Sequence, residues 1–162
     1  MNIANVIVNI GAGKALATLI VSMLPVVELR GAIPVGVSLG LPVWEAAIIS
    51  VAGNMLPVPF IIAFVRVVFS WLRGKSKRLC RLADKLETRA KVKASAVKSY
   101  AFWGLMLFVA VPLPGTGAWT GAMIASVLDM RMNKAIPSIF GGVCIAGLIV
   151  SLATAGVLKL VC

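Results

Sequence analysis

Two charged side chains interrupt an apolar stretch of the sequence, in LPVVELRGAIPVG at residues 24–36. A charge in the middle of a hydrocarbon core costs about 2.5–3.5 kcal/mol on insertion scales, so a residue of this kind is expected to serve a function. A carboxylate takes up protons or cations, and a guanidinium contacts anions. We therefore expect Glu28 to couple a proton or another ion and Arg30 to bind an anionic substrate. The alternative is an ion pair that only closes the tip of a helical hairpin.

The spacing of this pair constrains the backbone around it. Residues two apart point to different faces of a helix, but to the same face of an extended segment. A direct contact between Glu28 and Arg30 therefore requires an unwound tip, which Pro25 and Gly31 permit.

Two helices are expected to begin near breaks of this kind. Pro34 fits the first turn of a helix that begins near Gly31, where its missing N–H costs nothing. A second break in the apolar sequence is PLPGTG at residues 112–117. There, Thr116 can cap a helix that begins near Gly117. Helix N-termini offer free N–H groups and partial positive charge, so two of them beside a guanidinium predict a substrate that carries a phosphate or a carboxylate.

Further candidates lie in or beside the two breaks. Asn54 can join a hairpin tip to a spanning helix by a hydrogen bond. Trp119 is unusual at mid-depth, because Trp prefers the membrane interface; it either packs in the core or forms one wall of a binding cavity. The complete set of candidate substrate-binding residues is Arg30, Gly31, Pro34, Asn54, Pro112, Pro114, Gly115, Thr116, Gly117, Trp119 and Thr120.

The sequence offers no constellation for enzymatic catalysis. It has no histidine, which removes the usual general base and the commonest metal ligand. Its three cysteines lack metal-binding spacing, and neither paired aspartates nor a Ser/Lys arrangement is present for chemistry on lipid phosphates. We therefore expect no enzymatic activity, no metal and no cofactor.

The composition determines the surroundings of these residues. The chain has 162 residues, of which 60% are apolar and only 13% are charged, and its mean hydropathy is +1.04. Soluble domains carry about 25% charged residues, and a chain this short has too little interior to hide so much apolar surface. The outer surface must therefore face lipid, and the length allows a single membrane domain.

The order of apolar runs predicts an all-helical integral membrane protein built from two similar halves. Each half has two half-length runs around a break, which indicates a re-entrant hairpin, followed by one transmembrane helix. A basic amphipathic helix joins the halves. The expected elements are a hairpin over about 15–41, a span over about 43–72 that is kinked at Pro57 and Pro59, the joining helix over 73–98, a hairpin over about 100–129 and a span over about 135–158.

The charges predict the orientation of the two halves. Segment 73–98 carries ten basic and two acidic residues, so it holds +8 of the net +11. Basic loops mark the cytoplasm, so this segment is expected there and both termini outside, in the plasma (inner) membrane of a prokaryote. Because each half crosses the membrane once, tandem halves are inverted repeats, as in secondary transporters. Confinement of the charge to one loop argues against nucleic acid as a partner and favours membrane lipids.

Three motifs carry a resemblance to a known family: ELRGAIPVGVSLG at 28–40, GNMLPVP at 53–59 and VPLPGTGAWTG at 111–121. With them the chain resembles the putative small multidrug export protein family, which is related distantly to the DedA membrane proteins. Pro112, Pro114 and Gly115 match the P-x-P-G motif of DedA proteins, whereas Thr116 stands where those proteins carry an acidic residue. The resemblance implies a multipass transporter, of drugs by the family's name or of a lipid carrier by the DedA kinship.

The leading hypothesis is a proton- or ion-coupled secondary transporter of an amphiphilic anion, such as undecaprenyl phosphate or a phospholipid. Two spans and two hairpins enclose little volume, so a homodimer or a higher homo-oligomer is expected. The alternatives are a small multidrug or cation exporter with the same fold, and a membrane scaffold subunit that transports nothing. The scaffold predicts a closed Glu28–Arg30 pair without an adjacent cavity.

Overall fold

The computed structural model describes residues 3–75, 94–113 and 115–161. Every regular element within these ranges is a helix. The joining helix expected over 73–98 lies mostly outside the described residues. The described helices are α1 (Ile3–Met23), α2 (Glu28–Ser38), α3 (Val43–Met55), α4 (Pro57–Lys75), α6 (Ala94–Ala110), α7 (Ala118–Val127) and α8 (Met132–Val161).

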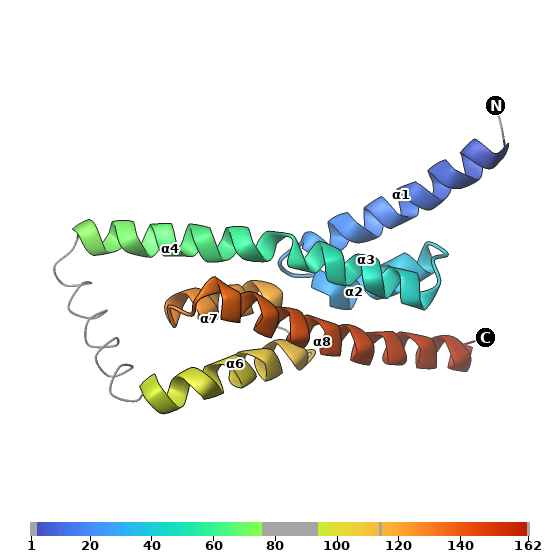
Figure 1. The fold of residues 1–162 in the computed structure, drawn as a ribbon. Coiled ribbons are helices and arrows are strands. Elements are labelled where there is room, and N and C mark those ends of the chain that lie inside the picture. Colours follow the sequence, from blue (N-terminus) through green and yellow to red (C-terminus); the bar gives the residue numbers. More distant parts are fainter. Residues whose placement is uncertain (1–2, 76–93, 114, 162) are drawn as a thin grey trace.

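The helices form two hairpins and two long elements (Figure 1). The hairpin of α1 and α2 lies in one half of the molecule's length, and the hairpin of α6 and α7 lies in the other half. The bends of the two hairpins meet near the middle. The consecutive helices α3 and α4 together, and the single helix α8, run along most of the length, and both chain ends lie toward the same end of the molecule.

Two boundaries differ from those predicted. Helix α1 begins at Ile3 instead of near residue 15, because the apolar stretch before Lys14 continues the helix. Helix α6 already includes Ala94, where the described residues resume, whereas the second hairpin is predicted to begin near residue 100. The predicted kink of the first span is present, since α3 ends at Met55 and α4 begins at Pro57. A proline removes a helical N–H and bends the helix that contains it.

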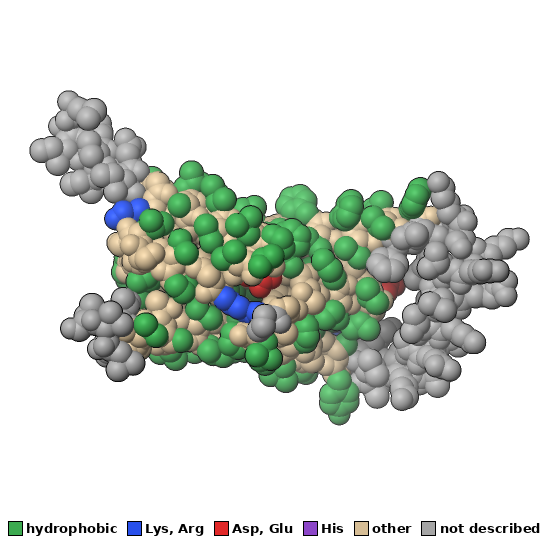
Figure 2. Space-filling view, turned by 180° about the vertical axis from the view of Figure 1, so that it is seen from behind, with side chains coloured by type: hydrophobic (Ala, Val, Ile, Leu, Met, Phe, Trp, Pro, Cys, Tyr) green, Lys and Arg blue, Asp and Glu red, His purple; other side chains and the backbone are tan. Residues whose placement is uncertain are grey.

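Two segments are long and apolar enough to cross a membrane by length and composition, Val43–Val68 and Met132–Val157. Only 28% and 39% of their most apolar windows are buried inside the molecule, which distinguishes them from the core helices of soluble proteins. Large apolar side chains therefore cover the exterior, and Phe60 is 73% exposed. Figure 2 shows a face made mostly of hydrophobic side chains, with basic and acidic atoms side by side near its centre. A surface of this kind matches lipid.

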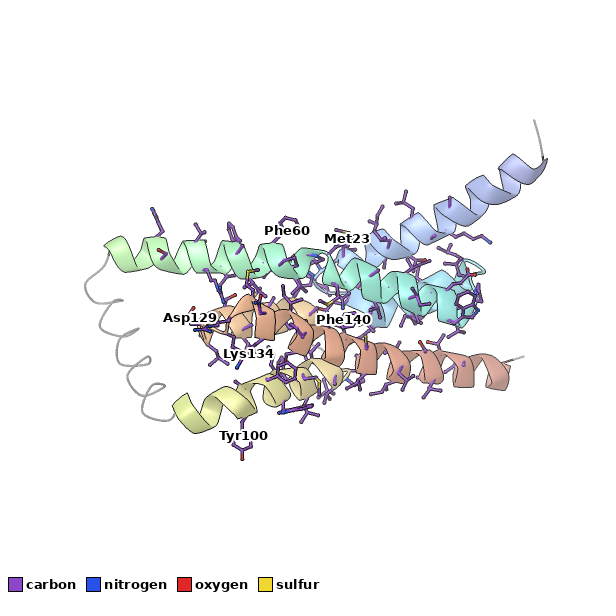
Figure 3. The ribbon with its side chains drawn as sticks, viewed as in Figure 1. Met23, Phe60, Tyr100, Asp129, Lys134 and Phe140 are labelled. Atoms are coloured by element: carbon purple, nitrogen blue, oxygen red, sulfur yellow. The ribbon has the colours of Figure 1, made fainter. Side chains whose placement is uncertain are left out.

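The two hairpins end with the same hydrogen bonds, 89 residues apart. Helices α2 and α7 both close in a Schellman motif, in which Gly40 and Asp129 have positive φ angles of 89° and 49°. Four backbone N–H···O pairs have counterparts: Leu39–Val35 and Leu128–Ile124, Gly40–Val37 and Asp129–Ser126, Leu41–Gly36 and Met130–Ala125, and Ala46–Pro42 and Ala135–Arg131. Figure 3 places Asp129, together with Lys134, near the end of the molecule where α8 begins.

Pro34 lies in the interior of α2, not in its first turn as predicted. The helix begins at Glu28, three residues earlier than expected, so the proline ring removes an interior helical hydrogen bond. Burial of the neighbouring face of α2, including Leu29 and Ile33, against the rest of the core compensates for this loss.

Close approach of α6 and α8 depends on Gly142. A Cβ at Gly142 would lie 2.6 Å from the Met106 carbonyl oxygen and 2.7 Å from the Val109 Cβ, whereas a Cβ at Gly156 on the same helix would meet nothing within 4 Å. Gly142→Ala is therefore expected to lower the free energy of unfolding by about 1–3 kcal/mol, and Gly156→Ala to leave it unchanged. Thermal unfolding in detergent checks this pair. Equal midpoints for the two variants would contradict the tight contact.

Candidate functional site

The site lies where the bends of the two hairpins meet, and Arg30 reaches across it from α2. One Arg30 terminal nitrogen donates to the Leu113 carbonyl. The other donates to the Val111 carbonyl, at 3.1 Å, and to the Thr116 hydroxyl, at 2.8 Å. All three acceptors belong to the connection between α6 and α7. A guanidinium presents its donors in a rigid fork, which suits several acceptors held at fixed positions.

Glu28 makes the complementary contact with the other side of the same connection. Its side chain is only 5% exposed, and its Oε1 accepts a hydrogen bond from the Trp119 backbone N–H at 3.3 Å. The carboxylate lies against Gly117, because a Cβ at that glycine would come within 2.6 Å of the Glu28 Cδ. Gly117 is the N-cap of α7 and has no side chain to cap the helix. Glu28 therefore caps α7 from the other hairpin.

Both charges match the dipoles of the helices that they touch. The carboxylate lies at the N-terminus of α7, where partial positive charge accumulates, and the guanidinium binds carbonyls that follow the C-terminus of α6, where partial negative charge accumulates. The hydrogen bonds of Glu28 and Arg30 thus run to the second hairpin, and each residue stabilises one of its two helix ends.

The backbone is strained at this contact. Glu28 has a φ of 49° and is one of two described residues other than glycine with a positive φ. The left-handed conformation costs an ordinary residue about 1–2 kcal/mol. Strain of this kind clusters at functional sites, where the surrounding structure holds it in place.

Thr116 does not cap α7 as predicted. The N-cap position falls one residue later, at Gly117, and no side chain of that position bonds to the helix. The Thr116 hydroxyl instead lies 2.7 Å from the Val111 carbonyl oxygen and 2.8 Å from the Leu113 carbonyl oxygen, and it accepts from Arg30. Thr116 thus holds together the carbonyls that the guanidinium binds.

Trp119 connects the two hairpins. Its indole N–H donates to the Met23 carbonyl at the end of α1, at 3.2 Å, and its ring packs on the hydrophobic core. Figure 3 shows Met23 near the middle of the molecule. Trp119 therefore packs against the core and ties α7 to the end of α1.

Some of the remaining predicted residues pack tightly beside the contact between the two hairpin bends, and others are exposed at its edge. Gly31 follows Arg30, and a Cβ there would collide with the Val27 side chain. Gly115 is exposed, has a φ of 86° and borders open space, because a Cβ would meet nothing within 4 Å. Pro112 is exposed and Thr120 is half-buried, and Pro114 lies outside the described residues.

Asn54 does not make the predicted hydrogen bond to a hairpin tip. It is fully buried near the end of α3, and both polar atoms of its amide lack a partner within the described structure. Ser50, one turn earlier on α3, is also fully buried, and its hydroxyl is likewise unpaired there. Sequence reasoning missed Ser50, although two polar residues four apart within an apolar span were a usable signal.

The sequence argument also missed Arg66, which binds the second hairpin at the end of α7. It lies on α4 and donates to the Met130 carbonyl, just after α7. The arginine thereby satisfies a carbonyl at the negative end of that helix. Among the described residues, no group of three or more His, Cys, Asp or Glu side chains could hold a metal ion.

Comparison with known proteins identifies the family. A family profile described as "Putative small multi-drug export protein" matches residues 28–149, a range that begins at Glu28 and includes Arg30 and the whole connection between α6 and α7. Comparisons with curated proteins and with solved structures find no match. Together with the two apolar spans, the profile indicates a membrane protein. Since 122 of the 162 residues (149 − 28 + 1) are matched, the chain belongs to the family of small multi-drug export proteins.

Proposed function

We propose that this protein is a secondary transporter built from two inverted repeats, in which re-entrant hairpins from opposite leaflets meet at the bilayer midplane. The identical hairpin closures and the two spans, each displaced by 89 residues, support the repeat. The opposite directions of the hairpins support the inversion (Figure 1). Such a fold places its site where interrupted helices meet. Segment 73–98 then lies in the cytoplasm and both termini lie outside.

One observation carries the proposal: the charged contact between the hairpin tips. Glu28 occupies the N-terminus of α7, which is the position that a bound anion would take. We infer that the carboxylate acts as a substitute anion when substrate is absent. Neutralisation of Glu28 by a proton or a cation would weaken its hold on α7, and a substrate anion could then take its place beside Arg30.

The surroundings of the contact favour an amphiphilic anion. Arg30 is half-buried, and the loop residues that it binds, Val111 and Leu113, are exposed on an apolar surface. A head group with a phosphate could reach the guanidinium from the side while its hydrocarbon tail stays in the membrane. Phosphate oxygens match the fork of an arginine better than one carbonyl does. A lipid-linked phosphate, such as undecaprenyl phosphate or a phospholipid, is the proposed substrate.

Glu28→Gln tests the coupling role. The amide keeps the shape of the carboxylate but cannot change its charge, so transport is expected to lose its dependence on pH and on an imposed cation gradient. The measurement is uptake of a fluorescent lipid phosphate into proteoliposomes over a range of pH values. Glu45→Gln, in the first turn of α3, is the matched control and should keep the wild-type profile. An unchanged ion dependence in Glu28→Gln would exclude the proposed coupling.

Export of hydrophobic cations is the second candidate, because the family description names multi-drug export and a buried carboxylate can accept a cation. It makes a different prediction for the two charges: Glu28 is required and Arg30 is dispensable for binding. Binding of a cationic dye and of a lipid phosphate to wild type, Glu28→Gln and Arg30→Gln separates the candidates. If neither ligand binds, the scaffold alternative remains.

A further inference from the structure

Two buried polar side chains on α3 lack hydrogen-bond partners within the described structure. They are the hydroxyl of Ser50 and both polar atoms of the Asn54 amide, and neither residue is exposed at all. Because they are four residues apart on a helix, their side chains are neighbours on one face. Buried polar groups are almost always satisfied in folded proteins, by the protein, by water or by an ion. Two adjacent exceptions therefore point to a ligand.

The packing of α2 on α3 places Asn54 near the depth of Glu28, with Ser50 one helical turn away from that level. The two helices run antiparallel (Figure 1), and a Cβ at Gly36 would lie 3.0 Å from the Ala46 Cβ, which fixes their register. Glu28 precedes Gly36 by eight residues, and Asn54 follows Ala46 by eight. At 1.5 Å per residue, both are displaced by about 12 Å in the same direction. The backbones of Glu28 and Asn54 are thus at about the same level along the two helices.

The charge at this depth calls for a cation. The described partner of the Glu28 carboxylate is a single long hydrogen bond from Trp119. The terminal nitrogens of Arg30 are engaged by Val111, Leu113 and Thr116. The N-terminus of α7 and the nearby charge of Arg30 offset part of the cost of burying this carboxylate, but its one described hydrogen bond comes from a neutral donor. Water could satisfy the hydroxyl and the amide, but it would leave the negative charge in place.

We propose that Ser50, Asn54 and Glu28 together bind one sodium ion. The ligands would be the Ser50 hydroxyl oxygen, the Asn54 amide oxygen and one Glu28 carboxylate oxygen, a hard, all-oxygen set with a single negative charge. Divalent cations select sites with more carboxylates, or keep most of their water. This inference rests on the proposed function, because it names the ion that is coupled to transport. It also assigns Asn54 to the ion site and no longer to the substrate-binding residues.

The test measures ion binding without any transport. Purified protein in detergent is unfolded thermally in choline chloride, potassium chloride and sodium chloride of equal ionic strength. For the wild type, saturating sodium is expected to raise the midpoint by about 5 °C over choline. Radiolabelled sodium should bind with a stoichiometry of one. Sodium binding without transport would count against the proposed function alone. Transport without sodium binding would count against the ion site alone.

Variants assign the site to its residues. Asn54→Leu removes the amide, keeps the branched shape of the side chain and breaks no hydrogen bond of the described structure, so the sodium response should disappear. Any change of its stability in choline then reflects the larger side chain. Ser50→Ala should likewise lose the sodium response. The control is Ser138→Ala on α8, which loses a 2.6 Å hydrogen bond to the Phe102 carbonyl; it should be destabilised in choline and keep the full sodium response.

Three results would overturn the site. Equal midpoints in sodium and choline would exclude it. An effect of sodium that survives in Asn54→Leu would place the ion elsewhere. Stabilisation by low pH alone, with no response to sodium, would mean that a proton neutralises Glu28 instead.

Discussion

Replacement of Arg30 by glutamine is expected to abolish transport of an anionic substrate and to lower the free energy of unfolding by about 3 kcal/mol. The stability is lost because the carbonyls of Val111 and Leu113 lose their charged donor, and because Glu28 remains buried without a nearby positive charge. Chemical denaturation in detergent measures the loss of stability, and uptake of lipid phosphate into proteoliposomes measures the loss of transport.

Two comparisons isolate the geometry of the guanidinium from its charge. Arg30→Lys keeps the charge but cannot bind three acceptors through a planar fork, so it should recover part of the stability and little of the transport. Arg131→Gln removes a basic residue just before α8 and should change neither quantity by much. Wild-type stability in Arg30→Gln would show that the observed hydrogen bonds contribute nothing to the contact.

Gly117→Ala is expected to cost about 2–5 kcal/mol of stability, for two separate reasons. The glycine has a φ of 145° and a ψ of −168°, a conformation that other residues adopt only at a cost of about 1–3 kcal/mol. Its added Cβ would also lie 2.6 Å from the Glu28 Cδ and 2.7 Å from the Oε1, which displaces the carboxylate from the N-terminus of α7. The thermal midpoint in detergent measures the loss.

A double-mutant cycle separates these reasons. In a Glu28→Ala background the space beside Gly117 is free, so Gly117→Ala should cost only its backbone strain. The coupling between the two substitutions should therefore reach at least about 1 kcal/mol. Gly115→Ala is the control, since that glycine also has a positive φ but a Cβ there would meet nothing within 4 Å. A coupling of zero would show that Glu28 and Gly117 do not touch.

The sequence predicted the positions of the important charges better than it predicted their partners. Glu28 and Arg30 stand out because charge is rare in apolar surroundings, and that signal needs no structure. The carbonyls of Val111 and Leu113 could not be found, because every residue has a carbonyl and only the fold shows which ones are unpaired. The hydrogen bonds of both charges run to the second hairpin, a possibility that pair spacing alone does not reveal.

Errors at the helix starts have a common physical cause. The predicted cap at Thr116 and the predicted first-turn position of Pro34 both assumed that each helix satisfies its own end. In the structure, α7 is capped by Glu28 from another hairpin, and α2 begins at Glu28 in a left-handed conformation, so Pro34 falls inside it. Local rules fail where tertiary contacts take over the role of a cap.

The depth of the hairpin tips tests the central claim most directly. Val26, in the first bend, and Leu113, in the second, are exposed positions that can each carry a single bimane label on a cysteine, after Cys80, Cys144 and Cys162 are replaced by serine. Quenching is then measured in bilayers of lipids that carry bromine at different depths. Labels at both tips are expected to be quenched most by bromine near the ends of the acyl chains. Strong quenching only by bromine near the head groups, at either tip, would contradict the meeting of two opposed hairpins inside the bilayer.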